Sequence, residues 1–179
     1  MKKINIVVIG AGLYVCGKDT PGYGTILPAI FESKRYNENI GAIHCISTSI
    51  SSSQKFLDKA EQLKKKTGVD IEVNAYPKID SVKNFSYKDV LKDISKPACA
   101  IVSVPDHLHH QVTKDCLESG LHSLVVKPLT PTYKEGEDLV KIAKIKIHKH
   151  FKGKNHCKGS NRTISTPVDK IKDNKVHYN

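Results

Sequence analysis

The chain has 179 residues, of which 39% are hydrophobic, and a formal net charge of +11. This length favours one domain, or one domain with a tail, and no apolar run approaches the roughly 18 residues of a membrane span. Residues 144–179 hold ten Lys and Arg against two acids, so the charge belongs to the C-terminal end, which also lacks interleaved aromatic residues. We therefore predict neither a membrane nor a nucleic acid as a partner.

The five cysteines are odd in number and scattered, and none forms a C-x-x-C pair. Such a pattern is typical of a reducing compartment and argues against a disulfide framework. Lys2 and Lys3 precede an apolar run that is too short for the core of a signal peptide. We therefore predict a soluble, cytoplasmic protein.

The first predicted element is a strand over residues 4–9 that runs directly into Gly10-Ala11-Gly12. Its unbroken β-branched run is typical of a strand covered on both faces. Gly10 permits a sharp turn, and Gly12 has no side chain to hold a phosphate away from the backbone. These features are typical of the start of a dinucleotide-binding βαβ unit. We therefore name Gly10, Ala11, Gly12 and Leu13 as candidate cofactor-binding residues.

The glycine pattern departs from G-x-G-x-x-G/A, because Val15 takes the place of the third small residue. Gly17 and residues 20–24 follow before any convincing helical pattern, so the spacing predicts a long phosphate loop with its helix starting near Gly24. Pro28 fits only near the start of that helix. A glycine turn after a first strand also occurs in α/β proteins that bind no nucleotide, and that alternative stays open.

A second strand is predicted over residues 40–47, and its end carries hydroxyls where an NAD-selective site carries Asp or Glu. Residues 47–53 include no carboxylate to repel a 2′-phosphate and offer hydroxyls that can donate to one. We therefore favour NADP over NAD and name Ser47 and Ser49 as candidate cofactor contacts. The serines at 51–53 equally fit the N-cap of a helix predicted over residues 54–67, and the two interpretations are compatible.

Strand and helix patterns alternate along the rest of the chain. The expected elements are a strand at 71–73, a helix at 86–94, a strand at 98–104, a helix at 109–119, a strand at 123–126 and a helix at 132–147. Such alternation predicts an α/β fold, a Rossmann-type doubly wound parallel sheet with right-handed crossovers. Gly10, Ser47, Pro105 and Lys127 all lie at or just after predicted strand ends, which meet at the ligand-binding edge of such a sheet.

Three segments have the residues and spacing of a known family. They are residues 7–12 (VVIGAG), 101–109 (IVSVPDHLH) and 120–129 (GLHSLVVKPL). On these segments the chain resembles the N-terminal half of the glucose–fructose oxidoreductase and inositol dehydrogenase family (Gfo/Idh/MocA-like). The resemblance covers roughly residues 1–145.

The resemblance implies a dinucleotide-binding domain followed by a larger α/β domain, and oxidation or reduction of sugars and polyols with NAD or NADP. It places Pro105 and His109 along the nicotinamide and its ribose. Lys127 matches the lysine of the family's Glu-Lys-Pro motif, which approaches the reacting hydroxyl or carbonyl. A positive charge there stabilises developing alkoxide character and can relay a proton, so Lys127 is the candidate catalytic residue and a cofactor contact. A surface lysine before a proline turn is the alternative.

Two departures from the family weaken the expectation of activity. Val126 replaces the glutamate of the Glu-Lys-Pro motif, and residues 1–145 would form the dinucleotide-binding domain with the second α/β domain missing. Residues 146–179 form a basic, irregular tail, which suggests a truncated product. The alternatives to a hydride-transferring oxidoreductase are therefore an inactive nucleotide-binding module and a non-functional gene fragment, whose uncovered surfaces would favour self-association.

Two histidine clusters raise the question of a metal site. One comprises His107, His109 and His110, and the other His148, His150, His156 and Cys157. Zinc sites use about four ligands, usually in tighter paired spacing, and His148 and His150 on a helix would point to different faces. We therefore predict no metal site.

Overall fold

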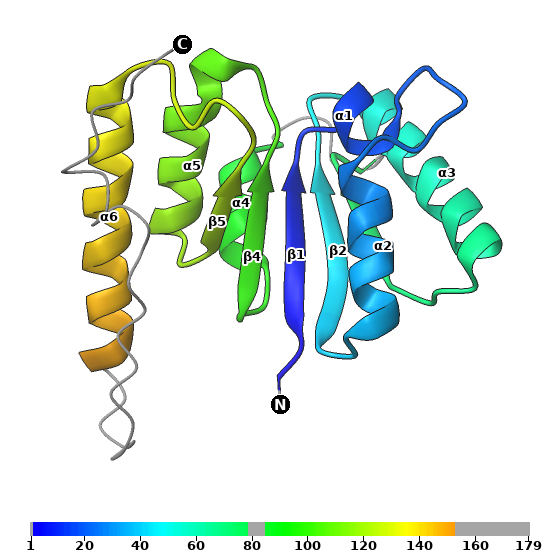
Figure 1. Cartoon of the computed structure of the whole chain (residues 1–179), viewed down its shortest axis with the longest axis horizontal. Coiled ribbons are helices and arrows are strands. Elements are labelled where there is room, and N and C mark those ends of the chain that lie inside the picture. Colours follow the sequence, from blue (N-terminus) through cyan, green and yellow to red (C-terminus); the bar gives the residue numbers. More distant parts are fainter. Residues whose placement is uncertain (1, 79–84, 153–179) are drawn as a thin grey trace, which may run out of the picture.

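The computed structural model describes residues 2–78 and 85–152, and side chains as far as residue 146. Within these ranges, five strands form one parallel sheet in the order β3-β2-β1-β4-β5 (Figure 1). The strands are β1 (Ile4–Ile9), β2 (Ile40–Ile46), β3 (Val73–Tyr76), β4 (Ala98–Val102) and β5 (His122–Val125). The central place of β1 agrees with its β-branched run, because a central strand is buried on both faces.

Helices cover both faces of the sheet. They are α1 (Leu13–Cys16), α2 (Ile26–Tyr36), α3 (Ile50–Thr67), α4 (Tyr87–Asp93), α5 (His109–Glu118) and α6 (Tyr133–Lys152), with a 3-10 turn over Asp106–Leu108 before α5. One buried cluster packs Ile6 and Val8 of β1 against α2 and α3, and another packs Val7 and Ile9 against α4 and α5. The predicted doubly wound α/β fold is therefore confirmed, and α6 packs against α5 at its outer side (Figure 1).

The third strand lies further along the chain than predicted. Ile71, which was expected inside the strand, is buried among the side chains beneath α3, whereas β3 begins at Val73 and pairs with β2 from Ile43 onward. The predicted bounds of 71–73 are therefore wrong. A buried residue in the segment that enters a strand gives the same apolar signal as a residue of the strand itself.

Helix α3 begins earlier than predicted, directly after Ser49. The Oγ of Ser49 caps the helix by accepting a hydrogen bond from the backbone N–H of Ser52 at 3.2 Å. The prediction that the serines at 51–53 cap the helix is therefore wrong, because they occupy its first turn.

Helix α6 continues to Lys152, across the predicted boundary at residue 145. Residues 153–179, the rest of the predicted irregular tail, lie outside the described residues. The second histidine cluster also lies outside the described side chains. The division into a domain and a tail therefore stays a prediction.

The phosphate loop differs from the prediction, because the short helix α1 follows Gly12 at once. Residues 17–24, called here the α1–α2 loop, then leave α1 and return to it, and the Thr25 N–H donates to the Tyr14 carbonyl at 2.7 Å. At the point of return Gly24 has a φ of +69°, and an added Cβ would lie 2.7 Å from both the Cys16 nitrogen and the Tyr14 oxygen. Only glycine allows the backbone to pack so directly on α1.

Gly10 lies where the carboxyl ends of β1 and β4 approach each other. An added Cβ would lie 2.0 Å from the carbonyl oxygen of Ser103, and the φ of +111° is one that L side chains rarely adopt. The surrounding backbone is fixed, because Gly10 N–H donates to Ile46 O at 2.8 Å and Ser103 N–H donates to Ile9 O at 2.9 Å. A side chain at residue 10 would therefore push two central strands apart.

We expect Gly10→Ala to lower the free energy of unfolding by more than about 2 kcal/mol, because backbone strain and steric overlap add. Urea denaturation measures this change. Gly12→Ala is the matched control, since Gly12 has a φ of −84° and its added methyl would meet no protein atom within 4 Å. Its free energy of unfolding should not fall by more than about 0.5 kcal/mol. Equal losses in the two variants would contradict this account.

Candidate functional site

A cavity of about 710 Å³ lies at the carboxyl edge of the sheet. Its wall combines the segments after β1, β2 and β4 with parts of the α1–α2 loop, α3, α4 and α5. The lining residues that matter most are Gly10, Ala11, Gly12, Lys18, Ser47, Thr48, Ser52, Tyr87, Val104, Pro105 and Leu108. Open parallel sheets bind their ligands at this edge. A smaller hollow of about 310 Å³, between α3 and β3, contains none of the predicted site residues.

The structure brings some of the predicted site residues to this cavity and leaves others away from it. Those that line the cavity are Gly10, Ala11, Gly12, Ser47 and Pro105. Those that are not part of its wall are Leu13, Ser49, His109 and Lys127. Leu13 is 63% exposed at the start of α1. The segments after β1, β2 and β4 thus converge as expected, whereas Lys127 after β5 lies outside the cavity wall.

Gly12 lines the cavity and leaves open space beside the backbone. An added Cβ would have no heavy atom within 4 Å. The carbonyl of Gly12 is already used, because it accepts hydrogen bonds from the N–H groups of Val15 at 3.2 Å and Cys16 at 3.1 Å, which begin α1. A bare backbone at this turn, beside a cavity, is what the close approach of a pyrophosphate requires.

The serines after β2 bond mainly to one another. The Ser47 hydroxyl lies 2.9 Å from Ser53 Oγ, donates to Ser49 O at 2.9 Å and contacts Tyr76 O at 3.3 Å. Ser49 caps α3, and its hydroxyl also donates to Ser52 Oγ at 3.0 Å. Ser47 and Ser49 therefore hold the turn between β2 and α3, and their predicted contacts with the cofactor stay a prediction.

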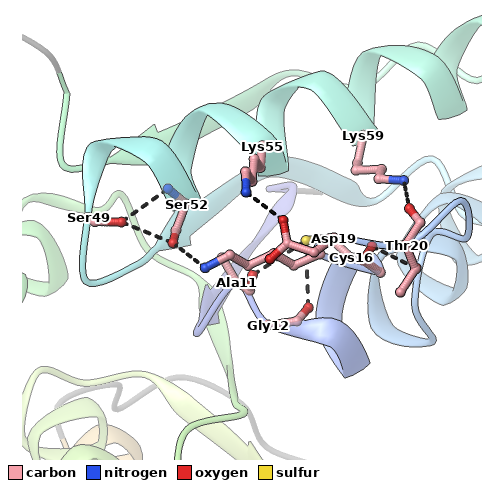
Figure 2. A network of polar contacts seen from close by, with 11 residues as sticks. Ala11, Gly12, Cys16, Asp19, Thr20, Ser49, Ser52, Lys55 and Lys59 are labelled. Carbon is pink, nitrogen blue, oxygen red and sulfur yellow. Dashed lines mark hydrogen bonds and ion pairs between the residues drawn. The ribbon is translucent and has the colours of Figure 1, made fainter.

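Lys18 is a cavity residue that the sequence analysis did not identify. It comes from the α1–α2 loop, and its Nζ donates to Ser52 Oγ at 3.0 Å. The only signal in the sequence is a lysine within a glycine-rich loop. Figure 2 shows how closely the loop follows α3, with Lys55 and Lys59 of the helix reaching Asp19 and Thr20.

His109 is fully buried and joins two loops at the carboxyl edge. Its Nδ1 lies 2.6 Å from Pro128 O, and its Nε2 lies 2.9 Å from Val104 O. Carbonyl oxygens only accept, so both contacts are hydrogen bonds when both ring nitrogens carry a proton. The ring fixes the backbone before Pro105 and after Lys127, and its expected place along the nicotinamide stays a prediction.

Lys127 is exposed and follows β5. The Val126 N–H donates to Val102 O at 3.1 Å, which extends the pairing of β4 with β5 up to the lysine. Among the described residues, no hydrogen bond or ion pair engages the Lys127 side chain. Its backbone is therefore held by the sheet and by the His109–Pro128 contact, and its ammonium group is available to a ligand.

A buried carboxylate supports the wall of the cavity at α4. Asp115 of α5 accepts hydrogen bonds from the hydroxyl of Tyr87, from Lys88 Nζ at 3.0 Å and from Gln111 Nε2 at 3.1 Å. Burial raises the pKa of Asp115, but these three bonds and the charge of Lys88 outweigh it, so the pKa is lowered. Burial, and then the bond to Asp115, raise the pKa of Tyr87. The Tyr87 phenol, which lines the cavity, therefore stays a proton donor to Asp115.

The sequence profile of the oxidoreductase family with an NAD-binding Rossmann fold matches residues 4–151. The chain belongs to this family. The resemblance that the sequence suggested is thereby confirmed, and so is a nicotinamide dinucleotide as the cofactor of the family. Two uncharacterized oxidoreductases of Schizosaccharomyces pombe are 36% identical over 66 residues and 34% identical over 73 residues.

Solved structures show the same fold. Biliverdin reductase from Synechocystis has a TM-score of 0.53 at 17% identity, covering 80% of this chain and 35% of that one. The WlbA dehydrogenase from Chromobacterium violaceum has a TM-score of 0.54 at 16% identity, covering 82% of this chain and 34% of that one. The KijD10 3-ketoreductase from Actinomadura kijaniata has a TM-score of 0.53 at 19% identity, covering 81% of this chain and 36% of that one.

The chain spans only part of the proteins it resembles. It covers 18% and 19% of the two yeast relatives and about a third of the solved structures. No helix within residues 2–78 and 85–152 is long and apolar enough to cross a membrane. In the same part of the chain, no three His, Cys, Asp or Glu side chains gather as metal ligands.

We expect Asp115→Asn to lower the free energy of unfolding by about 1–3 kcal/mol near neutral pH, because charge-assisted hydrogen bonds to a buried carboxylate are lost. The pKa of Asp115 is lower in the folded chain than in the unfolded one, so its stabilisation is present above about pH 4 and disappears as the pH falls through the folded value. Urea denaturation at several pH values measures the difference.

The control is Asp89→Asn, whose carboxylate is 65% exposed and pairs with Lys92 on the surface. It should change the free energy of unfolding by less than about 0.5 kcal/mol at every pH. If the difference in the free energy of unfolding between Asp115→Asn and the wild type grew toward acid pH, its sign would be the reverse of the one expected. That result would contradict a lowered pKa of Asp115.

Proposed function

We propose that this chain binds NAD(P) in the cavity at the carboxyl edge of the sheet and acts as the nucleotide-binding part of an oxidoreductase. The bound dinucleotide would supply hydride exchange between its nicotinamide and a carbon of the substrate. The observation that carries the proposal is the open space beside Gly12, at the wall of a cavity formed by the ends of β1, β2 and β4. Gly10, Ala11 and Gly12 would face the pyrophosphate, and Pro105 the nicotinamide half.

Lys127 is our candidate for the residue nearest the reacting oxygen. Its ammonium group has no partner among the described residues, and its backbone is fixed by the pairing of β4 with β5. A fixed positive charge stabilises an oxygen that gains negative charge as hydride leaves the adjacent carbon, and it can also pass on the hydroxyl proton. His109 would act on Lys127 indirectly, through the carbonyl of Pro128.

For the substrate we propose a sugar or a polyol. The resemblance to the Gfo/Idh/MocA-like family supports this class, and the WlbA dehydrogenase was crystallised with NADH and UDP-GlcNAcA. Biliverdin reductase has the same fold and was crystallised with biliverdin and NADP+. The fold alone therefore does not select the substrate, and the choice rests on the family.

A nucleotide-binding module without turnover is the second candidate. The position of Lys127 outside the cavity wall favours this candidate.

We also propose self-association, because the side chain of Leu124 on the edge strand β5 is 55% exposed. An apolar edge of this kind favours contacts between copies of the chain, which sedimentation at several protein concentrations would detect. We also infer a cytoplasmic location, because the four described cysteines are all free thiols.

Gly12→Ala tests the nucleotide site. The added methyl would occupy the space proposed for the pyrophosphate, so we expect NADH and NADPH each to bind more than about tenfold more weakly, a loss of at least about 1.4 kcal/mol. The melting temperature of the free protein should not fall, since the methyl meets no protein atom within 4 Å. Thermal shift with each dinucleotide measures both quantities. Unchanged binding in a folded Gly12→Ala protein would place the dinucleotide elsewhere.

Lys127→Met tests turnover. If the chain catalyses hydride transfer, we expect kcat with a sugar or polyol substrate to fall by about 10²- to 10³-fold, the usual effect of removing one group that stabilises an oxyanion. The affinity for NADPH should change far less. Lys141→Met, an exposed lysine of α6, is the matched control and should retain full activity. Binding of NADPH without any turnover by the wild type would favour the module.

A further inference from the structure

We infer that Lys18 is the ligand of a 2′-phosphate, and that the chain therefore selects NADP(H) over NAD(H). The inference rests on the proposed function, because it concerns one end of the same dinucleotide. It assigns the selectivity to a charge from the loop that precedes the second strand, with the Ser52 hydroxyl as a second donor, and not to Ser47 and Ser49.

The part of the cavity near the end of β2 is lined by one ammonium group and several hydroxyls. Ser47 and Thr48 follow β2, Ser52 lies in the first turn of α3, and Lys18 reaches this turn from the α1–α2 loop. No Asp or Glu is among the residues that line the cavity. An NAD-selective site carries a carboxylate at the end of this strand to bind the ribose hydroxyls, and that carboxylate would repel a phosphate.

Lys18 keeps its charge available. Its Nζ donates to the neutral hydroxyl of Ser52 at 3.0 Å, and no carboxylate of the described residues forms an ion pair with it. Ser52 Oγ also accepts from Ser49 Oγ at 3.0 Å, so the Ser52 proton is not used in either contact. An ammonium group and a hydroxyl proton therefore lie together at the cavity wall, both able to donate to a phosphate oxygen.

The α1–α2 loop holds Lys18 in this position. Asp19, the next residue, has a φ of +62° and forms an ion pair with Lys55 of α3. Lys59 of α3 donates to the carbonyls of Thr20 at 2.6 Å and Gly22 at 2.8 Å. Figure 2 shows Lys55 and Lys59 extending from the helix onto the loop, further along α3 than Ser49 and Ser52. Of these three lysines, only Lys18 is among the residues that line the cavity.

This arrangement favours a phosphate more than a ribose hydroxyl. A 2′-phosphate carries close to two negative charges and accepts hydrogen bonds at three oxygens, whereas a 2′-hydroxyl is neutral. The loop is already fixed to α3, so little ordering is needed when the phosphate binds. Asp19 and Lys55 are therefore positioning residues for Lys18.

The test compares nucleotides that differ only in the 2′-phosphate. Binding of 2′,5′-ADP and 5′-AMP, and of NADPH and NADH, is measured by calorimetry for the wild type and for Lys18→Gln. We expect the wild type to bind 2′,5′-ADP and NADPH more tightly than their partners. Lys18→Gln should weaken both by about 10- to 100-fold, the effect of one lost charge-assisted hydrogen bond, and leave 5′-AMP and NADH within about twofold.

Two further variants separate charge at the site from charge in general. Lys65→Gln removes a lysine of α3 whose side chain is 77% exposed, and it should leave all four affinities unchanged. Lys18→Arg keeps the charge and should retain most of the preference for the 2′-phosphate. The preference should also shrink as the salt concentration rises.

Each outcome decides a different point. Equal affinity of the wild type for 2′,5′-ADP and 5′-AMP would overturn the inference, even with strong binding of both. An equal loss of NADH and NADPH binding in Lys18→Gln would overturn it too, because it would show that Lys18 only maintains the loop. If the folded wild type bound none of the four nucleotides, the proposed function itself would fail.

Discussion

The close packing of Gly10 on the backbone of Ser103 is the constraint on which the arrangement of the site depends. It joins the ends of two neighbouring strands, β1 and β4, with no side chain between them. The chain turns from β1 toward β2 on one side, and β4 and β5 lie on the other. A crevice opens at such a reversal of strand order, and here it becomes the cavity between Gly12 and Pro105.

Helix α5 ties the rest of the carboxyl edge together with two buried polar residues. His109 at its first position bridges the segments after β4 and β5, and Asp115 further along the helix binds Tyr87 and Lys88 of α4. Buried polar groups held by hydrogen bonds favour one arrangement of the surrounding elements over others. The loops of the site are thus set by a helix that does not itself contact most of the cavity.

How much could be predicted from the sequence depended on whether the signal was local. The strand at residues 4–9 and its glycine turn were predictable, because a buried central strand and a close backbone approach each leave a mark on adjacent residues. The bounds of β3 were not, because Ile71 is buried by α3 just before the strand begins. The cap of α3 was misplaced by two residues or more among identical serines, since any of them could accept the same hydrogen bond.

The site residues also divide into those with a local signal in the sequence and those without one. Gly10, Gly12 and Pro105 lie in short motifs, and they line the cavity. Lys18 was missed because its approach to Ser52, 34 residues away, depends on the path of an irregular loop. Asp115 was missed because its partner Tyr87 is 28 residues away, although an acid beside Cys116 on the buried side of a helix was a visible signal. His109 was named from its motif, but its burial between two carbonyls could not be predicted from local residues.

The α1–α2 loop begins and ends at nearly one point, because Thr25 bonds back to Tyr14 and Gly24 packs on the backbone of α1. Its length can therefore change without displacing α2 or any strand of the sheet. The loop contributes a charge to the cavity, and its Tyr23 packs against the core, so it can be exchanged as a unit where that contact is kept. In this chain, coenzyme preference would then be able to evolve separately from the fold, by insertion and deletion as well as by substitution.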